Sequence, residues 1–225
     1  MTLATVTVHC VGREQEPVAV IDHFAPAPDA LRAAAAGMTF APGDNHYPGI
    51  KAPVHESYMS DQGALLGKIM REVFGITDRV AVLDVGYALV TTPPSDLTLE
   101  QRIPHVDGLE PGRVALIHYL VPHGCNGTAF YHHHATGYET IDRGRSARYF
   151  ASLNDDLRTH GQPPPVYLDG DSPIFERIGH FAGTYNRALV YRGRLLHSGA
   201  IAAENSLSAD PAAGRLTITG FFAAS

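Results

Sequence analysis

The sequence has 225 residues, of which 44% are hydrophobic and 18% are charged. That composition is typical of a chain that buries a sizeable core, and it excludes disordered and fibrous proteins. Seventeen basic residues stand against 23 acidic ones, and the net charge of -6 argues against a broad nucleic-acid-binding surface. We expect a single domain spanning residues 1–225, with a small molecule or a peptide as its substrate.

The same overview bears on the compartment and on metals. No apolar run approaches the ~18 residues of a membrane span, and residues 1–12 lack the features of a signal peptide, so we expect a cytoplasmic protein that does not bind membranes. Cys10 and Cys125 are isolated and predict ordinary reduced thiols. The 13 histidines, several of them clustered, favour a metal site without locating it.

The first third of the chain predicts one strand and two helices. Residues 18–22 are typical of a short strand, and residues 26–36 of a helix that has proline near its start and glycine after its end. The polar stretch 43–56 predicts a loop. A second helix follows, capped by Ser60 or Asp61, because apolar residues then recur every three or four positions.

The rest of the chain is mainly strand. One helix, residues 146–158, precedes a proline-rich loop at 162–165. The other segments end at turn signals and predict strands: 79–92, 113–121, 127–133, 174–184, 187–191 and 215–222. Helices followed by many short strands predict an α+β fold, with a jelly-roll or barrel core flanked by N-terminal helices.

Three residues form a candidate metal site. His105 and Asp107 are two residues apart, so both side chains point to one face if the segment is extended. His197, in the apolar strand-like stretch 195–198, is a candidate third ligand. Two histidines and one carboxylate that leave the other coordination positions open are the arrangement of non-heme iron(II) oxygenases.

A candidate site for a carboxylate follows. Arg215 and Thr217 place a guanidinium and a hydroxyl on the same face of a terminal strand, and the guanidinium fork suits a carboxylate. The loop 202–213 would join this strand to the one that carries His197. The order of HxD, a later histidine and a later Arg-x-Thr is more specific than any of its parts.

This order resembles that of the iron(II)- and 2-oxoglutarate-dependent dioxygenases, particularly the prolyl-4-hydroxylase-like branch with its double-stranded β-helix, a cupin-like jelly-roll. Residues 18–36 resemble the strand and helix that open such domains, and residues 116–130 resemble the branch's tyrosine-bearing strand and glycine-rich turn. The segments HYPG, PHVDG, NRALVYRG, LHSG and GRLT are most similar to an uncharacterised bacterial family.

The resemblance implies cofactors and roles. It implies that His105, Asp107 and His197 hold Fe(II) and act as the catalytic residues, and that Arg215 and Thr217 bind the distal carboxylate of the co-substrate 2-oxoglutarate. Tyr119 matches a position where related enzymes place a tyrosine against the same carboxylate. Hydroxylation of a substrate carbon is then the default reaction.

Other interpretations stay open. A cupin-like metal protein without 2-oxoglutarate-dependent activity, or a binding module with a decayed site, would share the fold. The other candidate metal ligands are two residues of a histidine run that share a strand face, which is equally typical of a polar exposed face: His132 and His134.

Four further positions have simpler interpretations beside a functional one. We expect His118 to be a hydrogen-bonded sheet residue on the opposite face from Tyr119. Asn186 is expected in a turn, or else at the mouth of the pocket. The stretch from Asn45 to Gly49 is expected to be a loop, or else a cover over the substrate. For Arg215 the alternative is an ion pair with an acidic residue such as Asp169 or Glu176.

Overall fold

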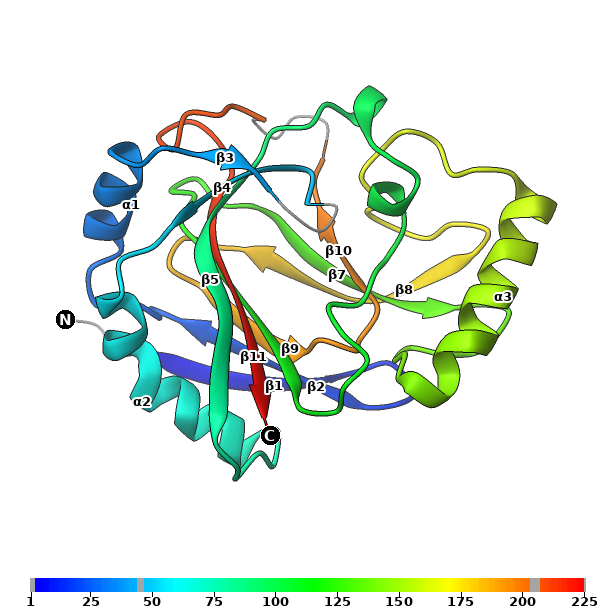
Figure 1. Cartoon of the computed structure of the whole chain (residues 1–225), viewed down its shortest axis with the longest axis horizontal. Helices are drawn as coiled ribbons and strands as arrows, with labels where there is room; N and C mark the ends of the chain where they lie inside the picture. Colours follow the sequence, from blue (N-terminus) through cyan, green and yellow to red (C-terminus); the bar gives the residue numbers. More distant parts are fainter. Residues whose placement is uncertain (1–2, 44–46, 203–206, 225) are drawn as a thin grey trace.

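Two antiparallel sheets form the protein (Figure 1). The structure is a computed structural model that describes residues 3–43, 47–202 and 207–224. The large sheet has the strand order β1-β2-β9-β6-β11-β5-β4-β3 and the small sheet the order β10-β7-β8. The strands are β1 Thr5–Val11, β2 Glu16–Asp22, β3 Ala41–Pro42, β4 Gly49–Pro53, β5 Val80–Val90, β6 Arg113–Tyr119, β7 Cys125–His133, β8 Phe175–Gly183, β9 Ala188–Arg192, β10 His197–Ala200 and β11 Leu216–Ala224.

The helices cover the outer faces of this pair of sheets. They are α1 Pro28–Ala36, α2 Ser57–Glu72 and α3 Arg143–His160, with short 3-10 helices η1 Pro94–Asp96 and η2 Glu100–Arg102. In Figure 1, α1 and α2 lie on the side of the large sheet and α3 lies beside the small sheet. Buried residues of α2 pack against the large sheet, and Tyr149 and Leu153 of α3 pack against β7 and β8.

Strand β11 illustrates how period-two alternation places the candidate site. Leu216, Ile218 and Phe222 face the helices and belong to the core between the large sheet and α1 and α2. Thr217 and Phe221 point to the opposite face and line a cavity between the sheets. Because successive strand residues face opposite sides, an apolar outer set leaves the inner positions available for a site.

A smaller apolar core joins the inner faces of the two sheets. Val18, Leu189 and Tyr191 of the large sheet meet Phe130 of the small sheet there. The rings of Phe130 and Tyr191 contact edge to face, with centroids 5.1 Å apart. Aromatic pairs of this geometry stabilise packing beyond the area they bury, so this core fixes the spacing of the sheets beside the cavity.

The structure corrects three expectations about the N-terminal part. The described chain begins with the strand pair β1 and β2, so helices do not lead the fold, and α1 and α2 are inserted between strands. The predicted loop 43–56 contains β4, which pairs with β5. Helix α2 begins at Ser57, before the expected caps, because the backbone N–H of Ser57 donates to the Nδ1 atom of His55 at 3.2 Å.

Other expectations hold where the residues are described. The six long predicted strands and the helix around 146–158 are present, with ends that differ by a few residues. Cys10 and Cys125 are free thiols, as predicted. Among the described residues, none of the helices combines the length and hydrophobicity that a membrane crossing needs. The loop predictions at 44–46 and 203–206 lie outside the described residues.

Candidate metal centre

The three predicted metal ligands converge on one point. The Nε2 atom of His197 lies 3.3 Å from one carboxylate oxygen of Asp107, and the Nε2 atom of His105 lies 3.7 Å from the other. Two ligand atoms bound at about 2.1 Å and at right angles on one metal would be about 3.0 Å apart. The observed spacing is therefore close to that of three ligands on one face of a metal.

Backbone pairing brings these residues together. His105 and His197 form an antiparallel bridge, in which each backbone N–H donates to the carbonyl of the other, at 2.9 and 3.0 Å. The backbone N–H of Asp107 donates to the carbonyl of Gly193 at 2.6 Å. The segment 105–107 is thus held against β10 and the turn before it, so the position of the ligands does not depend on the side chains alone.

The ring of His197 is oriented by a second hydrogen bond. Its Nδ1 atom lies 2.8 Å from the carbonyl of Leu195, which can only accept, so Nδ1 carries the proton and Nε2 presents a lone pair toward Asp107. Metal-binding histidines commonly donate their other N–H in this way. Burial lowers the pKa of His197 to about 4, so the ring is neutral near pH 7.

The other histidine is more open. The His105 side chain is 54% exposed, on the wall of the cavity. Partial loss of water and the neighbouring His197 ring lower its pKa, while Asp107 acts in the opposite direction. Both imidazoles are therefore in the neutral form that binds metals.

Asp107 is a buried carboxylate whose charge is poorly compensated. Its Oδ2 atom is buried and has no hydrogen-bond partner. Burial raises the pKa of Asp107 to about 6, although His105 and the guanidinium of Arg113 oppose that rise. A cation bound between the three ligands would compensate the charge.

Arg215 is buried at the wall of the same cavity. Its side chain donates from Nη2 to the carbonyl of Gly127 at 2.9 Å, and its Nε atom is buried with no partner. Although burial acts to lower its pKa, nearby Cys125 and tyrosine side chains raise it, so the guanidinium stays charged. Among the described residues, no carboxylate forms an ion pair with it.

The predicted pairing of Arg215 with Asp169 or Glu176 therefore does not occur among the described residues. Asp169 instead pairs with Arg177 at 2.6 Å, and Glu176 lies beside His132. Gly127 helps to position the guanidinium. Its φ is +107°, and a Cβ at this position would come within 1.9 Å of the Phe181 carbonyl oxygen, so a glycine is needed at this bulge in β7.

The other two predicted co-substrate residues lie next to Arg215. Thr217 is fully buried, lines the cavity, and donates from its hydroxyl to the Ala88 carbonyl at 3.3 Å. The Tyr119 ring lies 5.6 Å from the Arg215 guanidinium, and its hydroxyl is 2.7 Å from the Thr128 hydroxyl. Thr128 lines the cavity, so Tyr119 supports the wall that holds Arg215.

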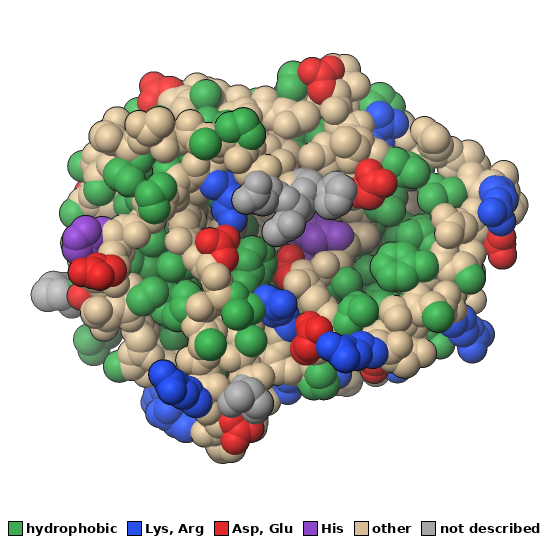
Figure 2. All heavy atoms as spheres, in the orientation of Figure 1, with side chains coloured by type: hydrophobic (Ala, Val, Ile, Leu, Met, Phe, Trp, Pro, Cys, Tyr) green, Lys and Arg blue, Asp and Glu red, His purple; other side chains and the backbone are tan. Residues whose placement is uncertain are grey.

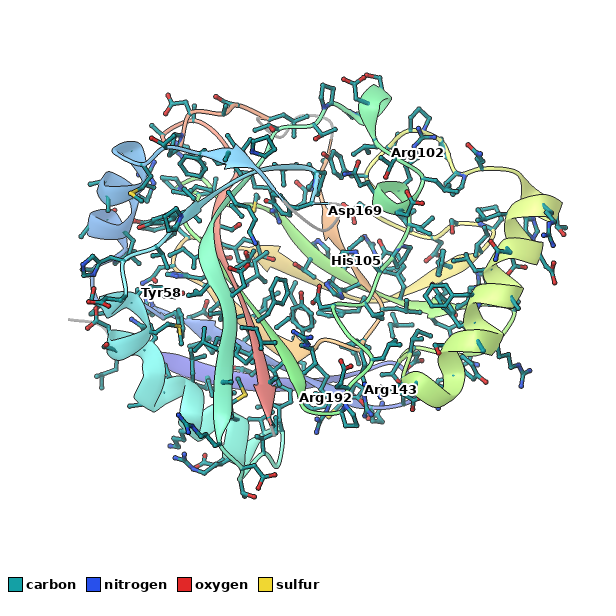
Figure 3. The ribbon with its side chains drawn as sticks, in the orientation of Figure 1. Tyr58, Arg102, His105, Arg143, Asp169 and Arg192 are labelled. Carbon is teal, nitrogen blue, oxygen red and sulfur yellow. The ribbon has the colours of Figure 1, made fainter. Side chains whose placement is uncertain are left out.

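All these groups surround one cavity of about 1000 Å³. Figure 2 shows the face of the molecule hollowed near its middle, and Figure 3 shows His105 near the middle of the same view, below Asp169 and far from Tyr58. The cavity is lined by His105, Asp107, His197, Arg215 and Thr217, and its walls extend along β5, β6 and β11.

Sequence reasoning missed two cavity residues. The Tyr191 ring contacts that of His197 at 4.8 Å between centroids and lines the cavity. Arg113 also lines it, and its buried Nε atom has no partner. Tyr191 lies in the segment NRALVYRG, which long-range pairing brings to the site: β9 pairs with β6, and Gly193 accepts from the backbone N–H of Asp107.

The remaining candidates lie elsewhere. His118 is a buried sheet residue, as predicted, whose Nε2 donates to the Oδ1 of Asn186 at 3.0 Å and whose Nδ1 accepts from the Tyr58 hydroxyl at 3.2 Å. Asn186 occupies a turn at φ 58° and bonds both backbone groups of Ala25, so it belongs to the turn and not to the cavity. His132 and His134 form a separate cluster with Glu176.

Comparison with protein families identifies the chain. Residues 2–222 match the model of a family described as a family of unknown function, DUF6445. The chain belongs to this family. A search of the curated proteins finds no match.

Solved structures share the fold of this family member. HygX from Streptomyces hygroscopicus, crystallised with nickel, 2-oxoglutarate and hygromycin B bound, superposes with a TM-score of 0.53 at 11% identity, covering 95% of this chain and 88% of HygX. HygX with nickel and 2-oxoglutarate bound gives a TM-score of 0.51 at 11% identity, covering 95% and 87%. This likeness concerns the fold, and the prolyl-4-hydroxylase-like branch stays a prediction.

Proposed function

We propose that this DUF6445 protein is an iron(II)- and 2-oxoglutarate-dependent oxygenase, and that its two sheets correspond to the double-stranded β-helix of that superfamily. The observation that carries the proposal is that one cavity contains both a carboxylate and a guanidinium whose charges are not compensated. Among the described residues, the buried Oδ2 atom of Asp107 has no hydrogen-bond partner, and no carboxylate pairs with the buried guanidinium of Arg215. A metal and a dicarboxylate would compensate both.

The donor set fits iron(II). Two neutral imidazoles and one carboxylate are the ligands of the facial site found in non-heme iron(II) oxygenases. His105, Asp107 and His197 offer ligand atoms that lie within 4.8 Å of one another. His105 is half exposed, so its ring has room to rotate and shorten its 3.7 Å distance to Asp107 when a metal binds.

The proposed role of Arg215 is to bind the distal carboxylate of 2-oxoglutarate. Burying an unpaired charge costs several kcal/mol. A ligand that brings a carboxylate to the guanidinium would offset that cost, which gives a reason for a buried arginine at this position. Thr217 would donate its hydroxyl to the same carboxylate in exchange for its long bond to the Ala88 carbonyl, and Tyr119 would hold the guanidinium in place. HygX, which shares the fold, is a protein crystallised with nickel and 2-oxoglutarate.

With dioxygen as the oxidant, iron(II) and 2-oxoglutarate would supply oxidative decarboxylation of the co-substrate to succinate and carbon dioxide, in which one oxygen atom enters succinate and the other hydroxylates a substrate carbon. The residues of the chain orient these partners. Leu195 fixes the ring of His197, the bridge between His105 and His197 fixes the segment that bears Asp107, and Tyr191 packs against His197 and keeps water from one side. Hydroxylation is the reaction that we expect.

The substrate has to fit the open end of the cavity. A volume of about 1000 Å³ lies at the upper end of typical ligand sites, so there is room for a substrate besides the co-substrate. Ile117 and Phe221 supply apolar walls, and the ion pair of Lys51 with Asp84, at 2.7 Å, lies at the same end. We propose a small-molecule or peptide substrate with both an apolar and a polar face.

Turnover of 2-oxoglutarate tests the proposal. Wild-type protein with iron(II), 2-oxoglutarate and air should form succinate slowly even without a substrate, and Asp107→Ala should not. Iron binding without 2-oxoglutarate consumption would favour the cupin-like metal protein instead. A folded protein with no affinity for iron would favour the decayed binding module.

A further inference from the structure

A second group of metal-binding side chains lies on the small sheet. His132 lies at the end of β7 and His134 in the turn that follows, and His132 is paired in register with Glu176 on β8. Each of the three offers a ligand atom, and these atoms lie within 4.8 Å of one another. Of this cluster, no residue lines the cavity that holds the first site.

The cluster includes a buried polar side chain that lacks a hydrogen bond. The His132 side chain is 7% exposed, and its Nδ1 atom is buried without a hydrogen-bond partner. The nearest carboxylate oxygen, on Glu139, lies 3.8 Å from Nδ1. Because Nδ1 is turned toward Glu139, Nε2 is the atom left for the cluster.

Glu139 is itself held in place. It is fully buried, and its two carboxylate oxygens accept from the backbone N–H groups of Arg13 and Glu14, at 2.8 and 2.9 Å. These bonds attach the turn between β1 and β2 to the small sheet. At 3.8 Å the Glu139 carboxylate does not hydrogen-bond His132 in this structure, but a small shift of the ring would let Nδ1–H donate to it, and a carboxylate that accepts from the non-ligating nitrogen is the usual support of a metal-bound imidazole.

We propose that His132, His134 and Glu176 bind a divalent cation of the zinc type, with Glu139 as the positioning residue for His132. Two imidazoles and one carboxylate are a common zinc donor set, which leaves a fourth position for water. Ligands of a tetrahedral ion at about 2.1 Å are about 3.4 Å apart, so the cluster must contract. His134 and Glu176 are exposed and can rotate inward without disturbing the core.

The bound cation would cross-link β7 and β8 at the end where the sheet has a register shift between Phe130 and Tyr131. That end also carries the carboxylate that holds the turn between β1 and β2. The site is therefore a structural one, and it does not depend on the oxygenase proposal. Its loss should change stability and metal content while leaving the cavity intact.

Metal stoichiometry tests this site. Untagged protein is freed of metal with a chelator and titrated with Zn²⁺ by calorimetry, in a background that carries His105→Ala and Asp107→Ala to disable the first site. This background should bind one equivalent and gain thermal stability from Zn²⁺. Adding His134→Ala or Glu176→Gln should weaken that binding at least tenfold and abolish the thermal shift.

His180→Ala is the matched control, because His180 is an exposed histidine on the same strand as Glu176. In the same background it should retain the full equivalent and the thermal shift. The proposal is overturned if the background variant binds no Zn²⁺, if Glu176→Gln binds it with unchanged affinity, or if His180→Ala weakens it as much. The last result would mean that zinc binds to surface histidines generally.

Discussion

Replacing Arg215 with methionine separates a ligand-binding arginine from a structural one. Removing one partner of a buried ion pair costs about 3 to 5 kcal/mol, because the other charge is left unpaired. No carboxylate among the described residues pairs with Arg215, whose hydrogen bond goes to the Gly127 carbonyl. The loss of that bond, about 1 kcal/mol, is offset by the removal of a desolvated charge.

We therefore expect Arg215→Met not to destabilise the unliganded protein: its free energy of unfolding should stay the same or rise by up to about 2 kcal/mol, which is up to about 4 to 8 °C in Tm for a chain of this size. Binding of 2-oxoglutarate should respond far more. Two charge-assisted hydrogen bonds contribute about 1.5 kcal/mol or more each, so affinity should fall about 100-fold. Arg215→Lys should lose less, because it keeps the charge without the fork.

The assay is thermal unfolding and calorimetric titration of 2-oxoglutarate into protein loaded with Ni²⁺, which cannot support turnover. Arg194→Ala is the matched control, because Arg194 pairs with Glu16 at 2.7 Å and does not line the cavity. It should leave the affinity unchanged. If unliganded Arg215→Met lost about 3 kcal/mol or more in its free energy of unfolding, as expected for a broken buried ion pair, the reasoning would be refuted. An unchanged affinity of Arg215→Met for 2-oxoglutarate would refute it as well.

Three further outcomes follow from the same structure. Asp107→Ala should stay folded, because it removes a poorly compensated carboxylate, and should lose most iron binding, measured as bound iron per chain. Burial lowers the pKa of His118 to about 4, so the folded state resists protonation of this ring and the protein loses stability as the pH falls from about 6.5, the pKa of the unfolded state, toward 4. At pH 5 the loss in the free energy of unfolding is about 2 kcal/mol. The Tm of His118→Gln should therefore fall less between pH 8 and pH 5 than the Tm of wild type. Asn186→Ala removes three side-chain hydrogen bonds and leaves alanine at φ 58°, which should cost about 3 kcal/mol and about 6 to 12 °C in Tm, read by calorimetry. Unchanged 2-oxoglutarate affinity in that last variant would confirm that its effect is on folding, and a selective loss of affinity would contradict it.

The candidate site could be predicted because its signals are local. His105 and Asp107 are two residues apart, and Arg215 and Thr217 have the same spacing, so an extended backbone puts each pair on one face. The placement of His197 opposite His105 depends on a long-range bridge. For that residue the prediction came from the apolar strand-like stretch 195–198, and the resemblance in order then supported it.

What the sequence did not predict depends on tertiary pairing. Strand β1 alternates threonine and valine but is mostly exposed, and it lies at the edge of the large sheet beside β2, so a core-based pattern misses it. Strand β4 contains glycine and proline, which favour a loop until β5 supplies its hydrogen bonds. Tyr191 reaches the cavity through the order of the large sheet, which no local pattern encodes.

The most direct test of the central claim is an anaerobic titration of the metal-free protein with iron(II) and then 2-oxoglutarate, followed by visible absorption. The account predicts a weak charge-transfer band that saturates at one equivalent of each in wild type. The band should be absent in Asp107→Ala and should need far more 2-oxoglutarate in Arg215→Met. A wild-type protein that binds iron at His105, Asp107 and His197 but gives no band at any 2-oxoglutarate concentration would contradict the account.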